Sequence, residues 1–424
     1  MGSGQWSVRQ WSGVALVVAA ANLTACSGAE VNPSPEASLT PTSTTAPTVA
    51  VAQACPTGNE NPALPDTTLV FQQPGLITDY LNSGGDVDQL VGALESAGLI
   101  PDHEQAWPSA MKDLTGDGLL DLAISLHDPS SSMMPQPAGS LFVWLCREAE
   151  YVLVHQTQPE TDHSAPVLLA VADLNGNGAS DVVFGRPVCG AHTCFLELGV
   201  LEWDGDRFVD RFRGSSRDLA SPEVLILLPS ATAPGTISVT SHGVQSVGAG
   251  PPRPLTRRWI WSQVAGAFVP DTEFLAAPVY RIHVVHDGDR AFREGHPRQA
   301  EYLYLKALDS PSLLEWEADP ATPASLEGYV RYRLVLNALA ESQVERAQSA
   351  RDELAAYAEA TPAAQDYLAM AQILLNHYQE SLDLSSACAE VRAFAEAHAA
   401  AVLEPLYYGY GNPTYTAEDV CPVD

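Results

Sequence analysis

The central part of the chain alternates between apolar and polar positions, a pattern that predicts antiparallel strands buried on one face. The alternation is clearest in residues 141–154, 200–209 and 259–269, and each of these segments contains a tryptophan. In the second segment, Asp204 and Gly205 separate two apolar runs, and Asp-Gly is a typical hairpin turn. We therefore predict three β-hairpins.

The hairpins belong to a longer repeat. Trp144, Trp203 and Trp261 follow one another at intervals of 59 and 58 residues, and Asp113 precedes Asp173 by 60. A fixed period of this length indicates stacked repeat units. Each unit is expected to contain a polar loop, a strand, a crossing segment and a tryptophan hairpin. We place the tryptophans in the core; the alternative is an exposed aromatic platform for glycans.

From about residue 280 the apolar period changes from 2 to 3.6, which predicts helices. Gly288, Ala300 and Tyr304 fall near the small and aromatic positions of a tetratricopeptide (TPR)-like helical hairpin, with its turn at residues 295–297. We expect roughly three such hairpins in degenerate form, stacked so that they bury their apolar faces. Such arrays commonly hold a partner in a groove. The alternative is that the array only packs against the β region.

Two short helices are expected ahead of the first repeat. The first covers residues 76–81 and ends before a Gly-Gly pair. The second begins after Asp86, a favourable N-cap, and stops at Gly98.

Residues 1–25 have the form of an export signal, with Arg9 ahead of a short apolar run at residues 14–18. The run is too short to span a bilayer comfortably. Residues 23–26, Leu-Thr-Ala-Cys, resemble the bacterial lipobox. The resemblance implies cleavage before Cys26 and lipidation of its thiol, and hence a chain that is lipid-anchored to a bacterial cell membrane on the extracytoplasmic side. The alternative is an ordinary secretory signal in which Cys26 is incidental.

The rest of the chain divides by composition and period. Residues 26–54 are rich in Ser, Thr, Pro and Ala, and they predict a disordered tether. A β-repeat domain with short N-terminal helices is expected at residues 55–275, and a TPR-like α-helical domain at 276–424. The predicted fold class is therefore α+β and multidomain, an antiparallel β-repeat followed by an α-helical hairpin array.

Charge excludes one class of partner. The chain has 21 Lys and Arg against 52 Asp and Glu, and its formal charge is −31. A surface of this kind repels nucleic acid, which needs basic patches. Apolar residues make up 46% of the 424, which is ample for real cores.

Two nine-residue loops, 113–121 and 173–181, carry the candidate chemistry. Oxygen-bearing side chains stand at the first, third, fifth and ninth positions, and a glycine at the sixth allows the sharp fold that brings them together. Ca²⁺ takes roughly six to eight oxygens from loops of this kind. The alternative is a metal-free turn, which Asp, Asn and Gly also favour. The candidate ligands are Asp113, Thr115, Asp117 and Asp121 in the first loop and Asp173, Asn175, Asn177 and Asp181 in the second.

Each loop runs directly into a β-prone stretch, unlike the helix-flanked calcium loops of EF-hands. The pattern resembles the FG-GAP/VCBS type of β-repeat, in which an Asp-rich loop opens a strand of a propeller-like blade. The resemblance implies a partial propeller of about three units, closed differently from a full one or capped by the flanking helices. It also implies calcium, which we expect to bind weakly, on the order of 10⁻⁴–10⁻³ M. Thr115, Asn175 and Asn177 lower the charge of the loops, and residues 230–235 of the third unit have no acid.

The cysteines predict a disulfide framework. With Cys26 lipidated, six remain, an even number that predicts three disulfides among 15 possible pairings. The expected pairs are Cys189–Cys194 by proximity, Cys388–Cys421 at the C-terminal end and Cys55–Cys146 by elimination.

Other candidate sites are weaker. His192 lies between Cys189 and Cys194, but the spacing is not the C-x-x-C of zinc or redox sites. His283 and His286 stand beside acids, which are also expected at a helix start. The sequence contains neither a G-x-S-x-G nor an H-E-x-x-H motif.

The sequence therefore favours a non-enzymatic, surface-anchored binding or scaffold lipoprotein with calcium-stabilised β-repeats. Its helical region would bind a protein or polysaccharide partner at the cell envelope. The alternative is an envelope-polysaccharide hydrolase or lyase that uses the β region as its platform. Two acids ~5–10 Å apart in a cleft would mark such an enzyme.

Overall fold

The computed structural model describes residues 54–58, 62–132, 137–159, 163–190, 192–316 and 321–423. The expected signal peptide, Cys26 and the tether up to residue 53 lie outside these residues. Val51–Asp424 forms one compact unit. In the described part of the chain, no helix has both the length and the apolar character needed to cross a membrane.

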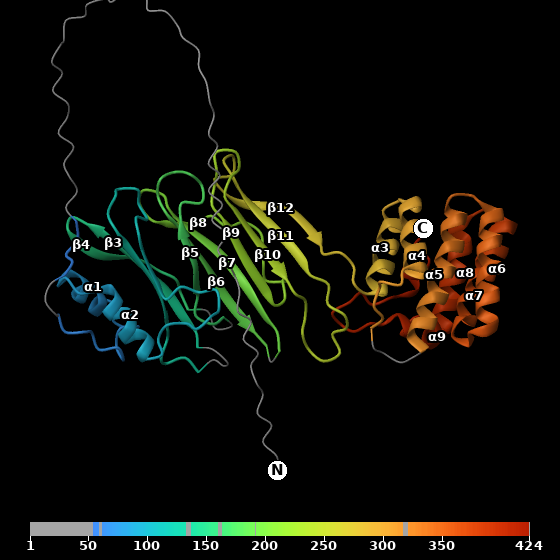
Figure 1. The fold of residues 1–424 in the computed structure, drawn as a ribbon, viewed down its shortest axis with the longest axis horizontal. Coiled ribbons are helices and arrows are strands. Elements are labelled where there is room, and N and C mark those ends of the chain that lie inside the picture. Colours follow the sequence, from blue (N-terminus) through green and yellow to red (C-terminus); the bar gives the residue numbers. More distant parts are fainter. Residues whose placement is uncertain are drawn as a thin grey trace, which may run out of the picture. The chain divides into compact units, whose positions relative to one another are not determined.

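Three antiparallel four-stranded sheets form the β region, and the strands of each sheet are adjacent in chain order (Figure 1). The mixture of sheets and helices confirms the α+β class, while no closure of a propeller ring is seen among the described strands. The first sheet contains β1 (Ser109–Lys112), β2 (Asp121–His127), β3 (Gly139–Arg147) and β4 (Glu150–Gln156). The second contains β5 (Val167–Ala172), β6 (Asp181–Cys189), β7 (Cys194–Trp203) and β8 (Phe208–Asp210). The third contains β9 (Pro222–Leu227), β10 (Thr236–Ser241), β11 (Leu255–Ser262) and β12 (Ala267–Leu275).

The sheets share apolar cores with their neighbours. Leu145 of the first sheet and Phe184 of the second belong to one buried cluster. Leu198 of the second sheet and Trp259 of the third belong to another. The three predicted hairpins are confirmed as β3–β4, β7–β8 and β11–β12.

The two short helices cover the first sheet. Residues of α1 (Gly75–Asn82) and α2 (Val87–Ser96) share a buried cluster with Trp144. The Asp86 side chain accepts a hydrogen bond from the Gln89 backbone N at 2.9 Å, which confirms the predicted N-cap. The flanking helices therefore cover this face of the first sheet, which is one of the two alternatives expected for so few repeat units.

The tryptophans follow the prediction only in part. Trp144 is fully buried, but Trp203 and Trp261 are half-buried near the ends of β7 and β11, and the Arg147 guanidinium lies 4.6 Å from the Trp203 ring centroid. In the third hairpin the fully buried tryptophan is Trp259. Residues two apart on a strand share a face, so alternation cannot tell which of the two lies over the centre of the core.

Helices α3 to α8 form three hairpins (Figure 1). The predicted turn is confirmed, because α3 ends at Arg293, α4 begins at Pro297, and Gly295 has a φ of +77°. Short helices α9 (Ala399–Val402) and α10 (Ala417–Val420) follow. The hairpins are α3 (Arg281–Arg293) with α4 (Pro297–Asp309), α5 (Ala321–Ala340) with α6 (Val344–Ala360), and α7 (Gln365–Ser381) with α8 (Leu384–Ala397).

A buried ion pair lies in the helical core. Arg333 Nε of α5 is 3.1 Å from Asp289 Oδ1 of α3, and the two side chains are 0% and 2% exposed. The hydroxyls of Tyr304, Tyr329 and Tyr415 all donate hydrogen bonds to the Asp289 carboxylate. Buried charges require such additional hydrogen bonds to offset the loss of hydration.

The described residues contain three disulfide bonds, as the cysteine count predicts. Cys55–Cys146 links the segment before α1 to β3, and Cys388–Cys421 links α8 to the segment after α10. Cys189–Cys194 joins β6 to β7 at a position where the two strands pair, which leaves neither sulfur as a thiolate for zinc.

Candidate metal centre

The first aspartate of each loop organises the backbone around it. Asp113 accepts hydrogen bonds from the backbone N of Gly116 at 2.7 Å and of Gly118 at 2.8 Å. Asp173 accepts the two equivalent bonds at 2.7 and 2.9 Å. Gly116 and Gly118 have φ angles of +81° and +83°, a left-handed conformation that glycine adopts without steric cost. The repeated glycines are therefore required by the backbone of the turn.

The last aspartate of each loop is buried at the start of a strand. Asp121 Oδ2 accepts a hydrogen bond from Leu114 N and Oδ1 accepts one from Cys146 N, both at 2.8 Å. Asp181 Oδ2 accepts the equivalent bond from Leu174 N at 2.9 Å. These contacts close each loop onto its sheet, and on their own they are also what a metal-free turn requires.

Carboxylates alone do not make a metal site here. Within the described ranges, no three His, Cys, Asp or Glu side chains are grouped closely enough to hold a metal ion. A cation in either loop would therefore need hydroxyl, amide or backbone carbonyl oxygens as well, which Ca²⁺ accepts.

The first loop has two features that fit a hard cation. Thr115 Oγ1 is buried and has no hydrogen-bond partner. The pKa of Asp121 is raised to about 6, first by burial and further by the negative charges of Asp117 and Asp113, against the lowering effect of its two backbone hydrogen bonds. An added positive charge nearby would favour the ionised form of Asp121 and so oppose this rise in its pKa. The oxygen donors of Asp113, Thr115, Asp117 and Asp121 thus suit calcium.

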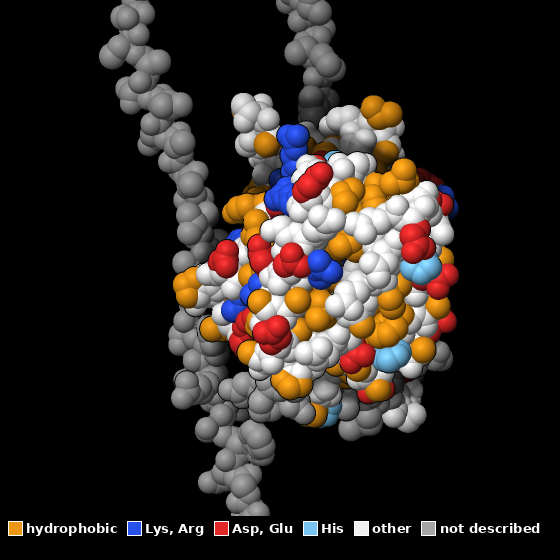
Figure 2. Space-filling view, turned by 90° about the vertical axis from the view of Figure 1, so that its right-hand side faces the viewer, with side chains coloured by type: hydrophobic (Ala, Val, Ile, Leu, Met, Phe, Trp, Pro, Cys, Tyr) orange, Lys and Arg blue, Asp and Glu red, His pale blue; other side chains and the backbone are white. Residues whose placement is uncertain are grey.

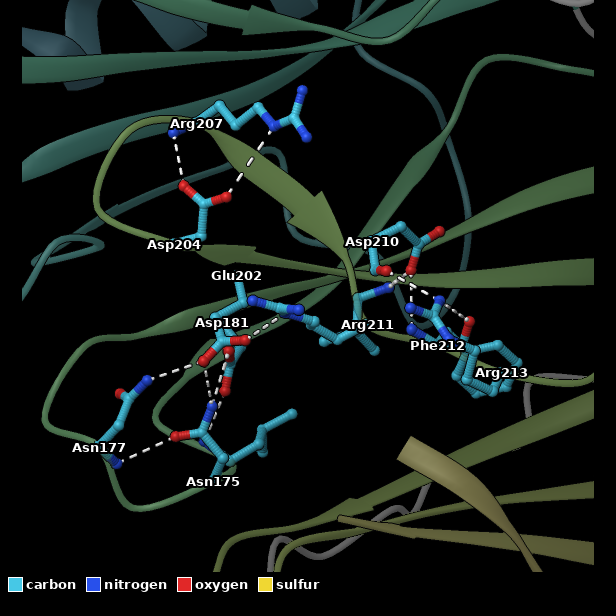
Figure 3. A network of polar contacts seen from close by, with 12 residues as sticks. Asn175, Asn177, Asp181, Glu202, Asp204, Arg207, Asp210, Arg211, Phe212 and Arg213 are labelled. Carbon is cyan, nitrogen blue, oxygen red and sulfur yellow. Dashed lines mark hydrogen bonds and ion pairs between the residues drawn. The ribbon is translucent and has the colours of Figure 1, made fainter. Parts of the chain in front are cut away.

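The second loop carries a partner that the sequence analysis missed, Glu202 of β7. The side-chain amides of Asn175 and Asn177 each donate to Glu202 Oε1 at 2.9 Å, and Arg211 Nε lies 2.6 Å from Glu202 Oε2 (Figure 3). The amide oxygen of Asn175 accepts from the backbone N of Asn177, and that of Asn177 accepts from the backbone N of Ala179. Both amides are therefore already satisfied within the protein.

Arg211 supplies a positive charge to the second loop. The pKa of Asp181 is raised to about 7, mainly by burial and also by the charges of Glu202 and Asp173, while Arg211 lowers it. By contrast, no basic side chain is among the leading causes of the pKa shift of Asp121. The two loops thus have the same backbone hydrogen bonds and different electrostatics, and the metal predicted in the second loop stays a prediction.

A sequence signal for Glu202 exists. In β7, residues 196, 198 and 200 are apolar and buried, and residue 202 continues the same face of the strand with an acid that is only 9% exposed. An acid at a position where alternation predicts an apolar residue marks a buried polar contact. Val182 of β6 pairs with Leu201 of β7, so Asp181 lies across from Glu202.

The third unit shows the loop without ligands, as predicted. Ser230 Oγ accepts a backbone hydrogen bond from Ala233 N at 3.1 Å, and the strand that follows is β10. The Ser230 hydroxyl thus accepts the kind of backbone hydrogen bond that the first aspartate accepts in the other two loops, and it brings no carboxylate to the turn.

The histidine pair does not form a metal site with the nearby acids. The ring centroids of His283 and His286 are 6.5 Å apart. Asp287 is paired with Arg253, whose two terminal nitrogens each lie 2.8 Å from a carboxylate oxygen, and Asp289 is paired with Arg333. Both acids are therefore occupied by arginines.

Compared with protein-family models, with curated proteins and with solved structures, the chain has no match in any of the three.

Proposed function

We propose that this chain is a non-enzymatic binding scaffold held at a bacterial cell surface by a lipid on Cys26. Its β region, of FG-GAP/VCBS-like type, is stiffened by calcium, and its helical hairpins present a surface to a protein or polysaccharide of the envelope. The lipobox-like residues 23–26 and the disulfide bonds of the described residues support an extracytoplasmic location.

The observation that carries the calcium proposal is the chemistry of the first loop. Three aspartates stand there with the buried, unpartnered hydroxyl of Thr115, and the pKa of Asp121 is raised in part by the other two carboxylates. A bound Ca²⁺ would supply the positive charge that this set of oxygens lacks, and it would be held by Asp113, Thr115, Asp117 and Asp121.

The second loop is proposed as the metal-independent version of the same turn. Arg211 and Glu202 neutralise each other there, and the amides of Asn175 and Asn177 complete the network. We therefore expect calcium to act mainly on the first sheet.

Binding is favoured over hydrolysis by the state of the acids near α3. A glycosidase needs two acids free to exchange protons with substrate. Asp287 and Asp289 are instead ion-paired with arginines. Figure 2 views the side on which Figure 1 labels α6 to α8, and acidic, basic and apolar side chains are interspersed across that face. A mixed surface of this kind suits a protein or glycan partner.

The test is thermal unfolding of residues 51–424 in calcium and in chelator. If the dissociation constant is on the order of 10⁻⁴–10⁻³ M, calcium at ~10 mM stabilises the fold by roughly 1.4–2.7 kcal/mol, which corresponds to a few degrees in Tm. Asp113→Ala should remove the response, and Ser230→Ala in the acid-free loop should leave it unchanged. A wild-type protein that melts identically in both buffers would remove calcium from the proposal.

A further inference from the structure

A cavity of about 320 Å³ lies between the loop at residues 243–253, helix α3 and the segment at residues 411–419. These three parts are joined by specific contacts. Asn412 Nδ2 donates to the carbonyl oxygens of Ala249 at 3.1 Å and Pro251 at 3.3 Å. Arg253 forms its two-pronged pair with Asp287 of α3. The walls of the cavity are therefore held in place by the fold.

Two imidazoles line this cavity, and each has a buried ring nitrogen with no protein partner. These atoms are Nδ1 of His283 and Nε2 of His286. His283 itself is 2% exposed, and its Nε2 lies 3.2 Å from the carbonyl oxygen of Pro251. A carbonyl can only accept, so Nε2 carries the proton, and in the neutral ring Nδ1 is an acceptor. Buried polar atoms are nearly always hydrogen-bonded, so Nδ1 calls for a donor such as a hydroxyl.

The cavity is also positive relative to the rest of the molecule. Its charged lining residues are three arginines and three aspartates, which sum to zero, but Asp289 is already neutralised by Arg333 from outside the lining. The balance is one net positive charge in a chain whose formal charge is −31.

The arginines at the cavity are partly available to a ligand. Arg290 shares Asp287 with Arg253, and the Arg290 side chain is 47% exposed. Arg293 is 45% exposed, and its ion-pair contact, with Asp419, is a loose one at 3.6 Å. Guanidinium groups bind carboxylates in a two-pronged geometry, which makes a carboxylate the natural anion for this site.

We propose that this cavity binds a hydroxylated organic acid of the sugar-acid class, such as a single uronic acid unit. Arg293 and Arg290 bind its carboxylate, and the unpartnered nitrogens of His283 and His286 take hydrogen bonds with its hydroxyls. The cavity lies outside both aspartate loops, so the proposal goes beyond the calcium scaffold and can fail independently of it.

The test is calorimetric titration of residues 51–424 with glucuronate and, in parallel, with glucose, which keeps the ring hydroxyls and lacks the carboxylate. Glucuronate should bind saturably and at least tenfold more tightly than glucose. Arg293→Gln, at a half-exposed position, should weaken glucuronate binding at least tenfold. The matched control is Arg258→Gln, which removes an equally exposed arginine of β11 that is paired with Asp271 of β12.

Four results would overturn the proposal. The first is the absence of saturable glucuronate binding. The second is equal binding of glucuronate and glucose. The third is a loss of binding in the control Arg258→Gln as large as that in Arg293→Gln. The fourth is acetate competing at the same concentration as glucuronate, which would reduce the cavity to a general anion site. Unchanged Tm values for both arginine variants establish that any loss of binding is local.

Discussion

Asp121 Oδ1 accepts a hydrogen bond from the backbone N of Cys146 at 2.8 Å, and Cys146 is in turn disulfide-bonded to Cys55. The last residue of the first aspartate loop is thereby coupled to β3 and, through the disulfide, to the segment before α1. Events in this loop, including the proposed binding of calcium, therefore act on the same part of the fold that the disulfide constrains.

The disulfides should contribute unequally to the stability of the fold, because they close loops of different length. Cys55 and Cys146 are separated by 91 positions, and Cys189 and Cys194 by 5. From the entropy of loop closure, the first bridge contributes about 4–5 kcal/mol and the second about 2 kcal/mol. Cys55→Ala with Cys146→Ala should therefore lower the free energy of unfolding in urea by about twice as much as Cys189→Ala with Cys194→Ala. Equal losses would contradict this view of the N-terminal bridge.

Substitution of Arg211, the positive charge beside the second loop, should leave the nearby carboxylates without a compensating cation. Arg211→Gln leaves Glu202, at 11% side-chain exposure, without its ion-pair partner. In the presence of chelator we expect the free energy of unfolding to fall by about 1–3 kcal/mol. Calcium should restore part of this loss, because the loop then lacks a positive charge.

The control is Arg207→Gln on the same hairpin, because Arg207 is 78% exposed and lies 3.9 Å from Asp204. Exposed pairs contribute little, so its effect should be within about 0.5 kcal/mol. If Arg211→Gln and Arg207→Gln behave alike in thermal melts with and without calcium, the second loop does not depend on an internal cation.

The buried ion pair of the helical core should be sensitive to the loss of one partner. Arg333→Met leaves Asp289 buried and unpaired, and such changes cost about 3–5 kcal/mol. The double variant Arg333→Met with Asp289→Leu should recover much of this loss, because no charge then remains without a partner. Urea unfolding of the single and double variants measures both steps. A double variant less stable than Arg333→Met would show that the carboxylate stabilises the fold mainly through the three tyrosine hydroxyls.

Low pH should destabilise the fold through the buried His286 of α3. The pKa of His286 is lowered to about 4, first by burial, with the charge of Asp289 opposing and that of His283 adding to the shift. The unfolded chain binds this proton near pH 6.5 and the folded chain only near pH 4. Stability from this group is therefore complete above about pH 6.5 and declines as the pH falls toward 4, by at most about 3 kcal/mol.

The variant His286→Asn should flatten this part of the stability curve, measured by urea unfolding at a series of pH values. His192→Asn, at an exposed position, should keep the wild-type slope. An unchanged slope in His286→Asn would assign the acid sensitivity to other groups, such as His283, whose pKa is also lowered by burial.

Local chemistry made much of this fold predictable. Periods of 2 and 3.6 located the hairpins and helices, and Asp86 caps its helix as expected. Long-range pairing was not predictable in the same way. Glu202 reaches the second loop because β6 and β7 pair in one particular register. The cavity is built from three segments that lie far apart in the sequence, so no local pattern marks it.

The most direct test of the account is the number of calcium ions that the protein binds, measured by equilibrium dialysis of residues 51–424 with radioactive calcium. We expect one ion per chain, with a dissociation constant on the order of 10⁻⁴–10⁻³ M. The ion should be lost in Asp113→Ala and kept in Asp173→Ala. Absence of binding at millimolar calcium, or binding that survives Asp113→Ala, would contradict this expectation.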